Sequence, residues 1–369
     1  MNFSCDRTML YETFSIVSRS IPAKNALPVL SCFLINASED GNITVSGFDM
    51  DLGITTTVTG EVSVPGTVAV DAKMLLDIIR SMGPDFINFA ENDNKTITVK
   101  GGKTEYILPV MDPETFPERP SAIGCEYITV DQKMLHSVIR QTVFAVSQSD
   151  VKGVYTGAFF NIHDGILEAV CTDSFRFAMR KEKYACDRDI SFLCQGRVLN
   201  ELIKIMKNDD GEVKIGLTGR HIVFEFDDTV MISRLVDGAY LNYSTLIPKS
   251  FKYTVKIKTE EMKKAIERAS VLINEKMKAP VRISLETNRI FITCKTPDGH
   301  SFDDEIITET NGGPLEIGVN NRNLLTVLSA CESEEVLMNF NSALSPIGFM
   351  PVEGDSFMFL IAPMRLNTK

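Results

Sequence analysis

The residue types that most often carry out chemistry are present in this chain, but not in catalytic or metal-binding spacings. The four histidines, His136, His163, His221 and His300, share no ligand spacing and have no cysteine pair nearby. The eight cysteines are scattered without a CxxC pair, which is typical of small buried side chains in a reducing cytoplasm. No G-x-S-x-G, HExxH or G-x-G-x-x-G motif occurs. The sequence therefore predicts no metal, no cofactor and no catalytic residue.

One tripeptide, Gly102-Lys103-Thr104, is similar to the end of a phosphate-binding P-loop. That motif needs a glycine five positions before Gly102, and this chain has Ile97 there. The tripeptide also lies in an expected hairpin, between two β-type runs, rather than between a strand and a helix. It is therefore interpreted as a hairpin turn and not as a nucleotide site.

Two segments combine polar and apolar residues in a way that fits a binding surface. Residues 172–178 (TDSFRFA) follow an apolar strand, and Asp173 is expected to bond nearby backbone amides at a strand-to-turn corner. Residues 357–366 (FMFLIAPMRL) are typical of a buried final strand with an apolar tail. For both segments, a purely structural role and a binding role are compatible with the residues.

The elements that position these segments belong to one structural module that is repeated three times along the chain. A basic residue follows a short strand and opens an amphipathic helical pattern at Lys73, Arg197 and Arg322, at steps of 124 and 125 residues. Another helical pattern begins each copy. It follows the expected N-cap residues of the three copies, which are Asp6, Asp131 and Thr259.

Alternating apolar runs separated by turn residues such as 163–165 (HDG) predict antiparallel strands between the helices. Linkers are expected at 111–124, which holds three prolines, and at 248–251. The sequence thus predicts the α+β class, with two helices packed on antiparallel sheets in each copy. The predicted domains are 1–120, 125–247 and 251–369.

Composition limits the function. With 369 residues, 44% hydrophobic and 24% charged, the chain is expected to be a soluble protein of two or three domains. The first ten residues do not form a signal peptide, and no apolar run is long enough to cross a membrane, so a cytoplasmic location is expected. The net charge of −11 argues against holding nucleic acid by bulk attraction. Any role on DNA must depend on local basic faces or on topology.

Several short motifs, in this order and spacing, resemble the bacterial DNA sliding clamp family, the beta subunit of DNA polymerase III. The resemblance covers essentially the whole chain. It is carried by 115–117 (TFP), 172–176 (TDSFR), 234–238 (RLVDG) with Tyr243 after it, 274–276 (NEK), 315–320 (LEIGVN) and 363–366 (PMRL).

The resemblance implies a non-catalytic processivity factor. Its homodimeric ring would encircle duplex DNA without regard to sequence. It would tether the polymerase III catalytic subunit, clamp-loader subunits, other polymerases and repair proteins through short peptide motifs. Geometry agrees with two copies. A ~123-residue domain has a diameter of roughly 35 Å. Three such spheres in a ring leave a hole of ~5 Å, narrower than an α-helix, whereas six leave room for a hydrated duplex.

A ring held by topology needs no strong phosphate binding, which agrees with the acidic composition. The helix faces would line the hole. The basic residues expected on or beside them are Lys73, Arg80, Arg140, Arg197, Lys204, Arg282 and Arg322. The resemblance also implies a basic DNA contact at Lys24, after the first helix.

In the family, a groove between the second and third domains takes partner peptides. Several positions depart from the family pattern: Ser174 replaces a small glycine, Phe175 a histidine and Phe177 an aliphatic residue, while Leu241 and Thr245 replace a common proline and arginine. Residues 367–369 extend past the usual end. The implied groove residues are Tyr155, Thr172, Arg176, Phe177, Leu241, Leu246, Leu360, Pro363, Met364, Arg365 and Leu366.

For the dimer interface, the resemblance indicates Tyr106 and Leu108 on an edge strand of the first domain, facing Leu272 and Ile273 of the third. Cross-interface pairs are expected between two cations and an acidic group. The cations are Lys73 and Lys103, and the acids are Asp298, Asp303, Asp304 and Glu305.

Two other classes of protein are weighed against the clamp. An enzyme, for example of nucleotide metabolism, would need titratable groups converging around Asp173 and Arg176. A structural scaffold would lack the basic faces and the apolar groove. The mass in solution discriminates between them, because a stable dimer without turnover favours the clamp.

Overall fold

The structure is a computed structural model that describes residues 1–24, 27–120, 124–273, 279–310 and 313–366. The first third of the chain contains helices α1 (Arg7–Val17) and α2 (Ala72–Ser81). Its strands are β1 (Asn2–Asp6), β2 (Cys32–Ala37), β3 (Asn42–Phe48), β4 (Leu52–Thr59), β5 (Glu61–Val64), β6 (Gly66–Asp71), β7 (Phe86–Asn92), β8 (Thr96–Gly101) and β9 (Thr104–Met111).

The middle third repeats this order, with helices α3 (Gln132–Arg140) and α4 (Gly196–Ile205). Its strands are β10 (Glu126–Asp131), β11 (Gly157–His163), β12 (Ile166–Thr172), β13 (Arg176–Lys183), β14 (Ile190–Gln195), β15 (Glu212–Leu217), β16 (His221–Phe226) and β17 (Thr229–Arg234).

The last third has helices α5 (Thr259–Ser270) and α6 (Asn321–Ala330). Its strands are β18 (Tyr253–Lys258), β19 (Val281–Glu286), β20 (Arg289–Lys295), β21 (Ser301–Ile307), β22 (Leu315–Val319), β23 (Glu335–Phe340), β24 (Ile347–Pro351) and β25 (Phe357–Ile361). In each third, one helix directly follows the first strand and the other follows a later strand. The predicted α+β class, with its threefold module, is confirmed.

Side-chain caps fix where the first two helices begin. The Asp6 carboxylate accepts hydrogen bonds from the first free amides of α1, and Asp71 does the same for α2 by accepting from Met74 N at 2.7 Å. The third copy differs from the prediction. Thr259 is the first residue of α5 rather than its cap, because its hydroxyl donates to Ser333 O at 2.8 Å instead of serving the helix amides.

Strand pairing crosses the predicted domain boundaries. β4 pairs antiparallel with β17, and β13 pairs antiparallel with β25. The chain accordingly forms two compact units, residues 1–133 with 201–235 and residues 134–200 with 236–369. The domain limits 1–120, 125–247 and 251–369 stay a prediction.

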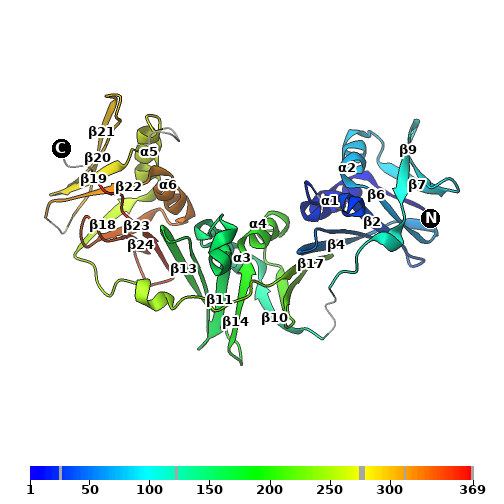
Figure 1. The fold of residues 1–369 in the computed structure, drawn as a ribbon, viewed down its shortest axis with the longest axis horizontal. Helices are drawn as coiled ribbons and strands as arrows, with labels where there is room; N and C mark the ends of the chain where they lie inside the picture. Colours follow the sequence, from blue (N-terminus) through cyan, green and yellow to red (C-terminus); the bar gives the residue numbers. More distant parts are fainter. Residues whose placement is uncertain (25–26, 121–123, 274–278, 311–312, 367–369) are drawn as a thin grey trace. The chain divides into compact units, whose positions relative to one another are not determined.

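In the first unit, one thirteen-stranded sheet runs in the order β10-β15-β16-β17-β4-β3-β2-β6-β9-β8-β7-β1-β5. Helices α1 and α2 contact each other, and α1 packs on β3 and β4 (Figure 1). The buried face of α1 is formed by Leu10, Phe14 and Val17, and Phe14 stacks on Phe33 of β2 at 5.0 Å between ring centroids.

In the second unit, an eight-stranded sheet runs β14-β11-β12-β13-β25-β24-β23-β18, and a four-stranded sheet runs β21-β20-β19-β22. Helices α5 and α6 lie side by side and α5 packs on β20 and β21 (Figure 1). No helix in the described part of the chain is long and apolar enough to span a membrane.

Candidate functional site

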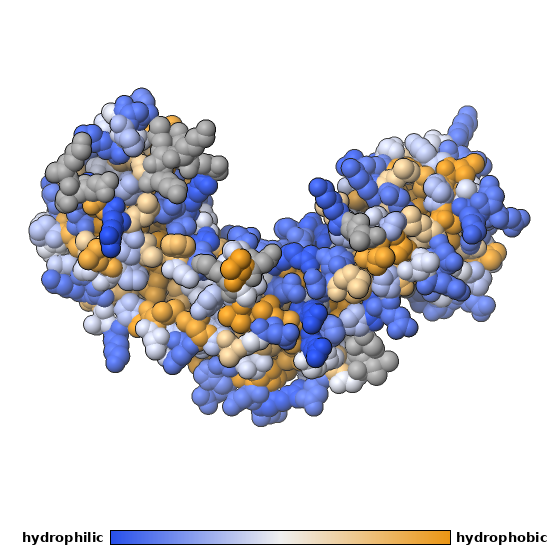
Figure 2. All heavy atoms as spheres, in the orientation of Figure 1, coloured by the Kyte–Doolittle hydropathy of each residue, from blue (hydrophilic) through white to orange (hydrophobic). Residues whose placement is uncertain are grey.

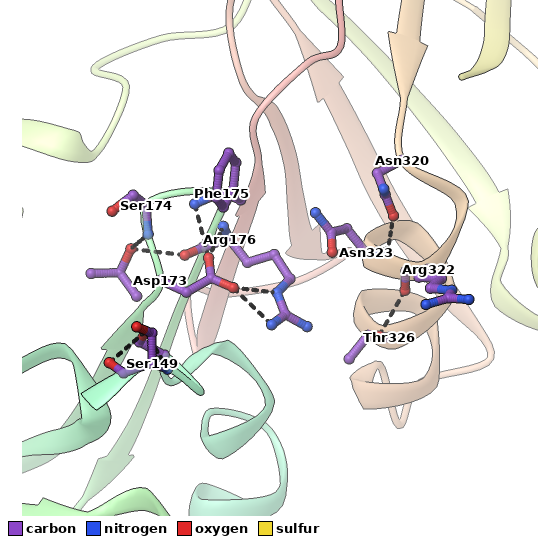
Figure 3. Close-up of polar contacts among 11 residues, drawn as sticks. Ser149, Asp173, Ser174, Phe175, Arg176, Asn320, Arg322, Asn323 and Thr326 are labelled. Atoms are coloured by element: carbon purple, nitrogen blue, oxygen red, sulfur yellow. Dashed lines mark hydrogen bonds and ion pairs between the residues drawn. The ribbon is translucent and has the colours of Figure 1, made fainter. Parts of the chain in front are cut away.

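The corner between β12 and β13 is held together by its own polar groups. Asp173 Oδ1 accepts from Phe175 N at 2.8 Å and from Arg176 N at 2.6 Å, and its Oδ2 faces the Arg176 guanidinium at 2.7 and 3.0 Å (Figure 3). Thr172 Oγ1 donates to Arg176 O at 2.8 Å. Asp173 therefore bonds the local backbone as predicted. The guanidinium of Arg176 is engaged inside the corner, which leaves fewer of its donors for a partner peptide.

Ser174 lies at the tip of this corner with φ of +79°, in the left-handed region that favours glycine. Its amide donates to Thr172 Oγ1 at 3.2 Å, which helps to hold the strained residue in place. The family glycine expected at this position thus has a physical reason here. A serine held at this φ carries a conformational cost that a glycine would not.

Below the corner, Phe177 and Leu360 lie opposite each other in the β13–β25 pairing. Both are buried, at 3% and 4% exposed, in a cluster with other side chains of the sheet. Phe177 and Leu360, two of the implied groove residues, therefore lie beneath the surface as a buried floor of the candidate groove and are not themselves exposed. The other members of this cluster are Val170, Met179 and Met358, against which Tyr240, Tyr243, Ile247, Phe251 and Met350 pack.

An aromatic group beside this floor contains the predicted Tyr155 together with Phe159 and Tyr240, which the sequence reasoning missed. Tyr240 stacks on Phe159 at 5.2 Å and meets Tyr155 edge to face at 6.2 Å. Tyr243 donates a hydrogen bond to the buried carboxylate of Glu168. Burial, together with that bond and the charge of Glu168, raises the pKa of Tyr243 to about 12, so the tyrosine stays neutral. The only sequence signal was aromatic residues on both sides of Leu241.

The chain end runs from the corner to β22. Ala362 N donates to Phe175 O at 2.8 Å, and Met364 N donates to Gly318 O at 2.8 Å. A Cβ on Gly318 would lie 2.6 Å from Met364 O and 2.7 Å from Leu366 Cδ2, so only glycine lets the tail lie this close. Pro363, Met364 and Leu366 are half-buried, whereas Arg365 is exposed.

The exposed apolar side chains near the corner are Phe175, 62% exposed, and Leu246, 42% exposed, in the short helix η6 (Tyr243–Leu246). Figure 2 shows apolar surface over the region of β11 and β13 on the visible face. Opposite the corner, the first turn of α6 presents Asn320, Arg322 and Asn323 (Figure 3). This polar side of the candidate site was not predicted.

Four of the eight predicted DNA-facing cations form ion pairs with carboxylates of the chain itself. Lys204 pairs with Glu201 at 2.7 Å, Arg80 with Asp77 at 2.7 Å and Arg140 with Glu332 at 3.5 Å. These pairs on or beside the helices are half-exposed and lower the local positive charge.

The structure places the remaining predicted cations differently from one another. Arg282 lies on β19, not on a helix, and pairs with Glu316 of the neighbouring strand at 2.6 Å. Lys24, Lys73 on α2 and Arg197 on α4 are exposed. Lys73 borders a shallow hollow over α2, whose other lining residues are Asp71, Met74, Asp77, Ile78 and Ser81.

The predicted interface residues of the first domain separate into two kinds. Leu108 is only 5% exposed, because it faces the hydrophobic core opposite Ile97 of β8. It is therefore a core residue of the chain, and the exposed neighbours are Tyr106, at 37%, and Ile107, at 61%. In the last third, Leu272 and Ile273 are half-buried. The 274–276 motif and residues 367–369 lie outside the described residues.

The repeated two-helix module on antiparallel sheets, with cation-bearing helices and a terminal tail docked beside the central corner, is the architecture of a DNA clamp. Models of the N-terminal, central and C-terminal domains of the DNA polymerase III beta subunit match residues 1–120, 129–242 and 244–365. The chain belongs to the DNA polymerase III beta subunit family.

Relatives and solved structures agree over the full length. The beta sliding clamp of Halalkalibacterium halodurans is 29% identical over 381 residues, covering 99% of this chain and all of the relative. The solved DNA polymerase sliding clamp of Bacillus subtilis is 27% identical with a TM-score of 0.94, covering both chains completely. A sliding clamp of Pseudomonas aeruginosa bound to griselimycin is 27% identical with a TM-score of 0.92, covering 99% of this chain and all of that one.

Proposed function

We propose that the chain is the processivity factor of its cell's replicative DNA polymerase, and that two copies close head to tail into a ring around duplex DNA. The observation that carries this proposal is the order of three clamp domains along the whole chain. The role would be non-catalytic, as membership of the clamp family implies. The protein would act in the cytoplasm, where bacterial chromosomes are copied.

Two unlike strand edges support the head-to-tail arrangement. β9 pairs with β6 only through Val110 and Met111, so one side of Thr104–Leu108 has no strand partner among the described residues. β21 is the end strand of the four-stranded sheet. Open edges are hazards unless they are covered. Pairing β9 of one copy with β21 of the other covers both and closes a ring with two identical contacts.

Charge supports the same pairing. Lys103 lies in the β8–β9 turn, where Lys100 pairs with Glu105 at 3.8 Å, and β21 carries Asp303, Asp304 and Glu305. Opposite charges on the two edges would steer the contact and disfavour pairing of two like edges. The charge count of the whole chain, −11, fits a ring that holds DNA by enclosing it.

We further propose that the corner, η6 and the docked tail form the site for extended peptide ends of polymerases and the clamp loader. An apolar anchor such as a Leu-Phe pair would lie on Phe175, Leu246 and Met364. A neighbouring glutamine would meet the polar groups of Asn320 and Asn323 across from the corner. The buried floor of Phe177 and Leu360 supports these contacts from below.

The ring is tested by loading the protein with its clamp loader onto a nicked circular plasmid and passing the complex through a sizing column. Protein held by topology stays with the circle in high salt and leaves after a restriction cut linearises it. Loss from intact circles by salt alone would refute the ring mechanism, because it would show ordinary phosphate binding. Omitting the loader provides the background level.

A further inference from the structure

Two ion pairs occupy the same helical position in two copies of the module. Asp77 is the sixth residue of α2, and Arg80 three residues later pairs with it at 2.7 Å. Glu201 is the sixth residue of α4, and Lys204 three residues later pairs with it at 2.7 Å. The second helix of the first two modules thus presents one acid paired with a basic residue of its own helix.

Glu201 has an additional partner that Asp77 lacks within the described chain. Arg19, just past the end of α1 in the preceding module, donates from Nη1 to Glu201 Oε2 at 2.9 Å. Burial alone would raise the pKa of Glu201, but the bonds and charges of Lys204 and Arg19 outweigh it and lower that pKa. The side chain of Glu201 is 20% exposed, whereas that of Asp77 is 50% exposed. Glu201 is thus the less exposed of the two acids, and its additional partner belongs to the preceding module.

The next junction along the chain follows the same logic. Arg140, the last residue of α3, lies 3.5 Å from Glu332, which follows α6 in the next module. Ser137 of α3 donates to the same carboxylate at 3.1 Å. At both junctions inside the chain, an arginine at the end of one module's first helix reaches an acid of the following module. The helix dipole favours a cation at that end.

A ring of two copies has one more kind of junction, from the third module of one copy to the first module of the other. The first helix of the third module, α5, carries Arg268 in its last turn. The corresponding acid on the first module of the other copy is Asp77, which lines the hollow over α2. We propose that Arg268 of one copy pairs with Asp77 of the other, so that the subunit contact repeats the ion pair of the internal junctions.

The guanidinium of Arg268 can serve this contact without leaving its own subunit. It already donates to Asp304 Oδ2 from Nε at 3.0 Å and from Nη2. Its side chain is still 54% exposed, and five donors arranged as a fork allow a second carboxylate on another edge. The resulting row, Asp304–Arg268–Asp77–Arg80, alternates in sign across the subunit boundary. This inference rests on the proposed ring.

Charge reversal tests the pair. D77R and R268E are each expected to raise the dimer dissociation constant roughly 10- to 100-fold at low salt, because each places like charges together at both contacts. The double variant D77R/R268E restores opposite charges and is expected to recover most of the affinity. D187R and K183E, exposed charges in the middle module, serve as matched controls. Sedimentation equilibrium measures all constants, and circular dichroism checks folding.

Mixing the two single variants gives the sharper result. In a head-to-tail ring of one D77R copy and one R268E copy, one contact has the reversed pair and the other the original pair. The mixture should therefore form heterodimers at concentrations where each variant alone is monomeric. Native mass spectrometry counts them, since the two masses differ.

The outcomes separate the two ideas. If the unaltered protein dimerises but both single variants dimerise equally well, Arg268 and Asp77 do not pair, and the ring still stands. If the singles weaken but neither mixing nor the double variant restores affinity, the pair is likewise refuted. If the unaltered protein is monomeric at every concentration, the ring itself fails and takes this pair with it.

Discussion

At the scale of single residues, the corner between β12 and β13 shows what sequence reasoning can and cannot reach. The expectation that Asp173 bonds local amides was correct, because an aspartate at a turn has few other local options. The engagement of Arg176 by the same carboxylate was not foreseen, and its role in the peptide groove stays a prediction. A sequence does not tell which of two nearby charges an arginine will choose.

The strained residue of this corner yields a stability prediction. Ser174→Gly is expected to raise the free energy of unfolding by about 0.5–1 kcal/mol, because glycine takes a φ of +79° without steric cost, although its unfolded state is more flexible. Urea unfolding measures it. Ser149→Gly, at an ordinary φ of −104°, is the control and should destabilise or leave the protein unchanged. A loss of stability in Ser174→Gly would show that the left-handed serine is not strained.

At the scale of elements, periodicity predicted the helices well and the connecting segments poorly. The apolar spacing of α2 and α4 was readable because one face of each helix must be buried. Tyr240 lies in an irregular segment after β17, where no period exists to place its ring against Phe159. Arg282, which was expected on or beside the helix faces, lies on β19, and its role toward DNA stays a prediction.

The docking of the tail on β22 gives a prediction at this scale. Gly318→Val is expected to displace residues 363–366 and to weaken binding of a partner peptide at least tenfold, because a side chain would overlap Met364 O and Leu366. Calorimetry with a polymerase C-terminal peptide measures the affinity. Gly313→Val is the control, since a Cβ there meets nothing within 4 Å.

A second variant keeps this test decisive if Gly318→Val alters folding. Deleting residues 363–369 removes the tail without touching β22 and should abolish peptide binding while leaving dimerisation intact. Unchanged peptide affinity in the deletion variant would place the partner site elsewhere on the protein.

At the scale of the whole molecule, the threefold repeat and the family resemblance were enough to predict the fold class. The repeat could be read because each module must bury the same helix faces. The continuity of the sheets across the module boundaries was not predicted, because pairing of β4 with β17 joins residues about 175 positions apart and leaves no local signal. The exposure of each side chain at the proposed subunit edges was also not predicted, because burial within the chain decides which of them remain available for contact with a second copy.

The exposed edge of the first module provides the last prediction, in which neighbouring residues of β9 should have opposite roles. Ile107 is 61% exposed and Ile307 of β21 is 80% exposed, so both would be covered when the two edges pair. Ile107→Lys and Ile307→Lys are each expected to raise the dimer dissociation constant about tenfold or more, since burying an isoleucine contributes ~1.5–3 kcal/mol. The fold of the single chain should not change.

Leu108→Ala should have the opposite effect: it should leave the dimer intact but lower the free energy of unfolding by ~2–4 kcal/mol, because it opens a cavity opposite Ile97. Leu344→Lys, at a residue 78% exposed in the last third, is the control for adding a charge to apolar surface. Sedimentation velocity and urea unfolding distinguish the two effects. A dimer of undiminished affinity in both lysine variants would remove the β9 and β21 edges from the subunit contact.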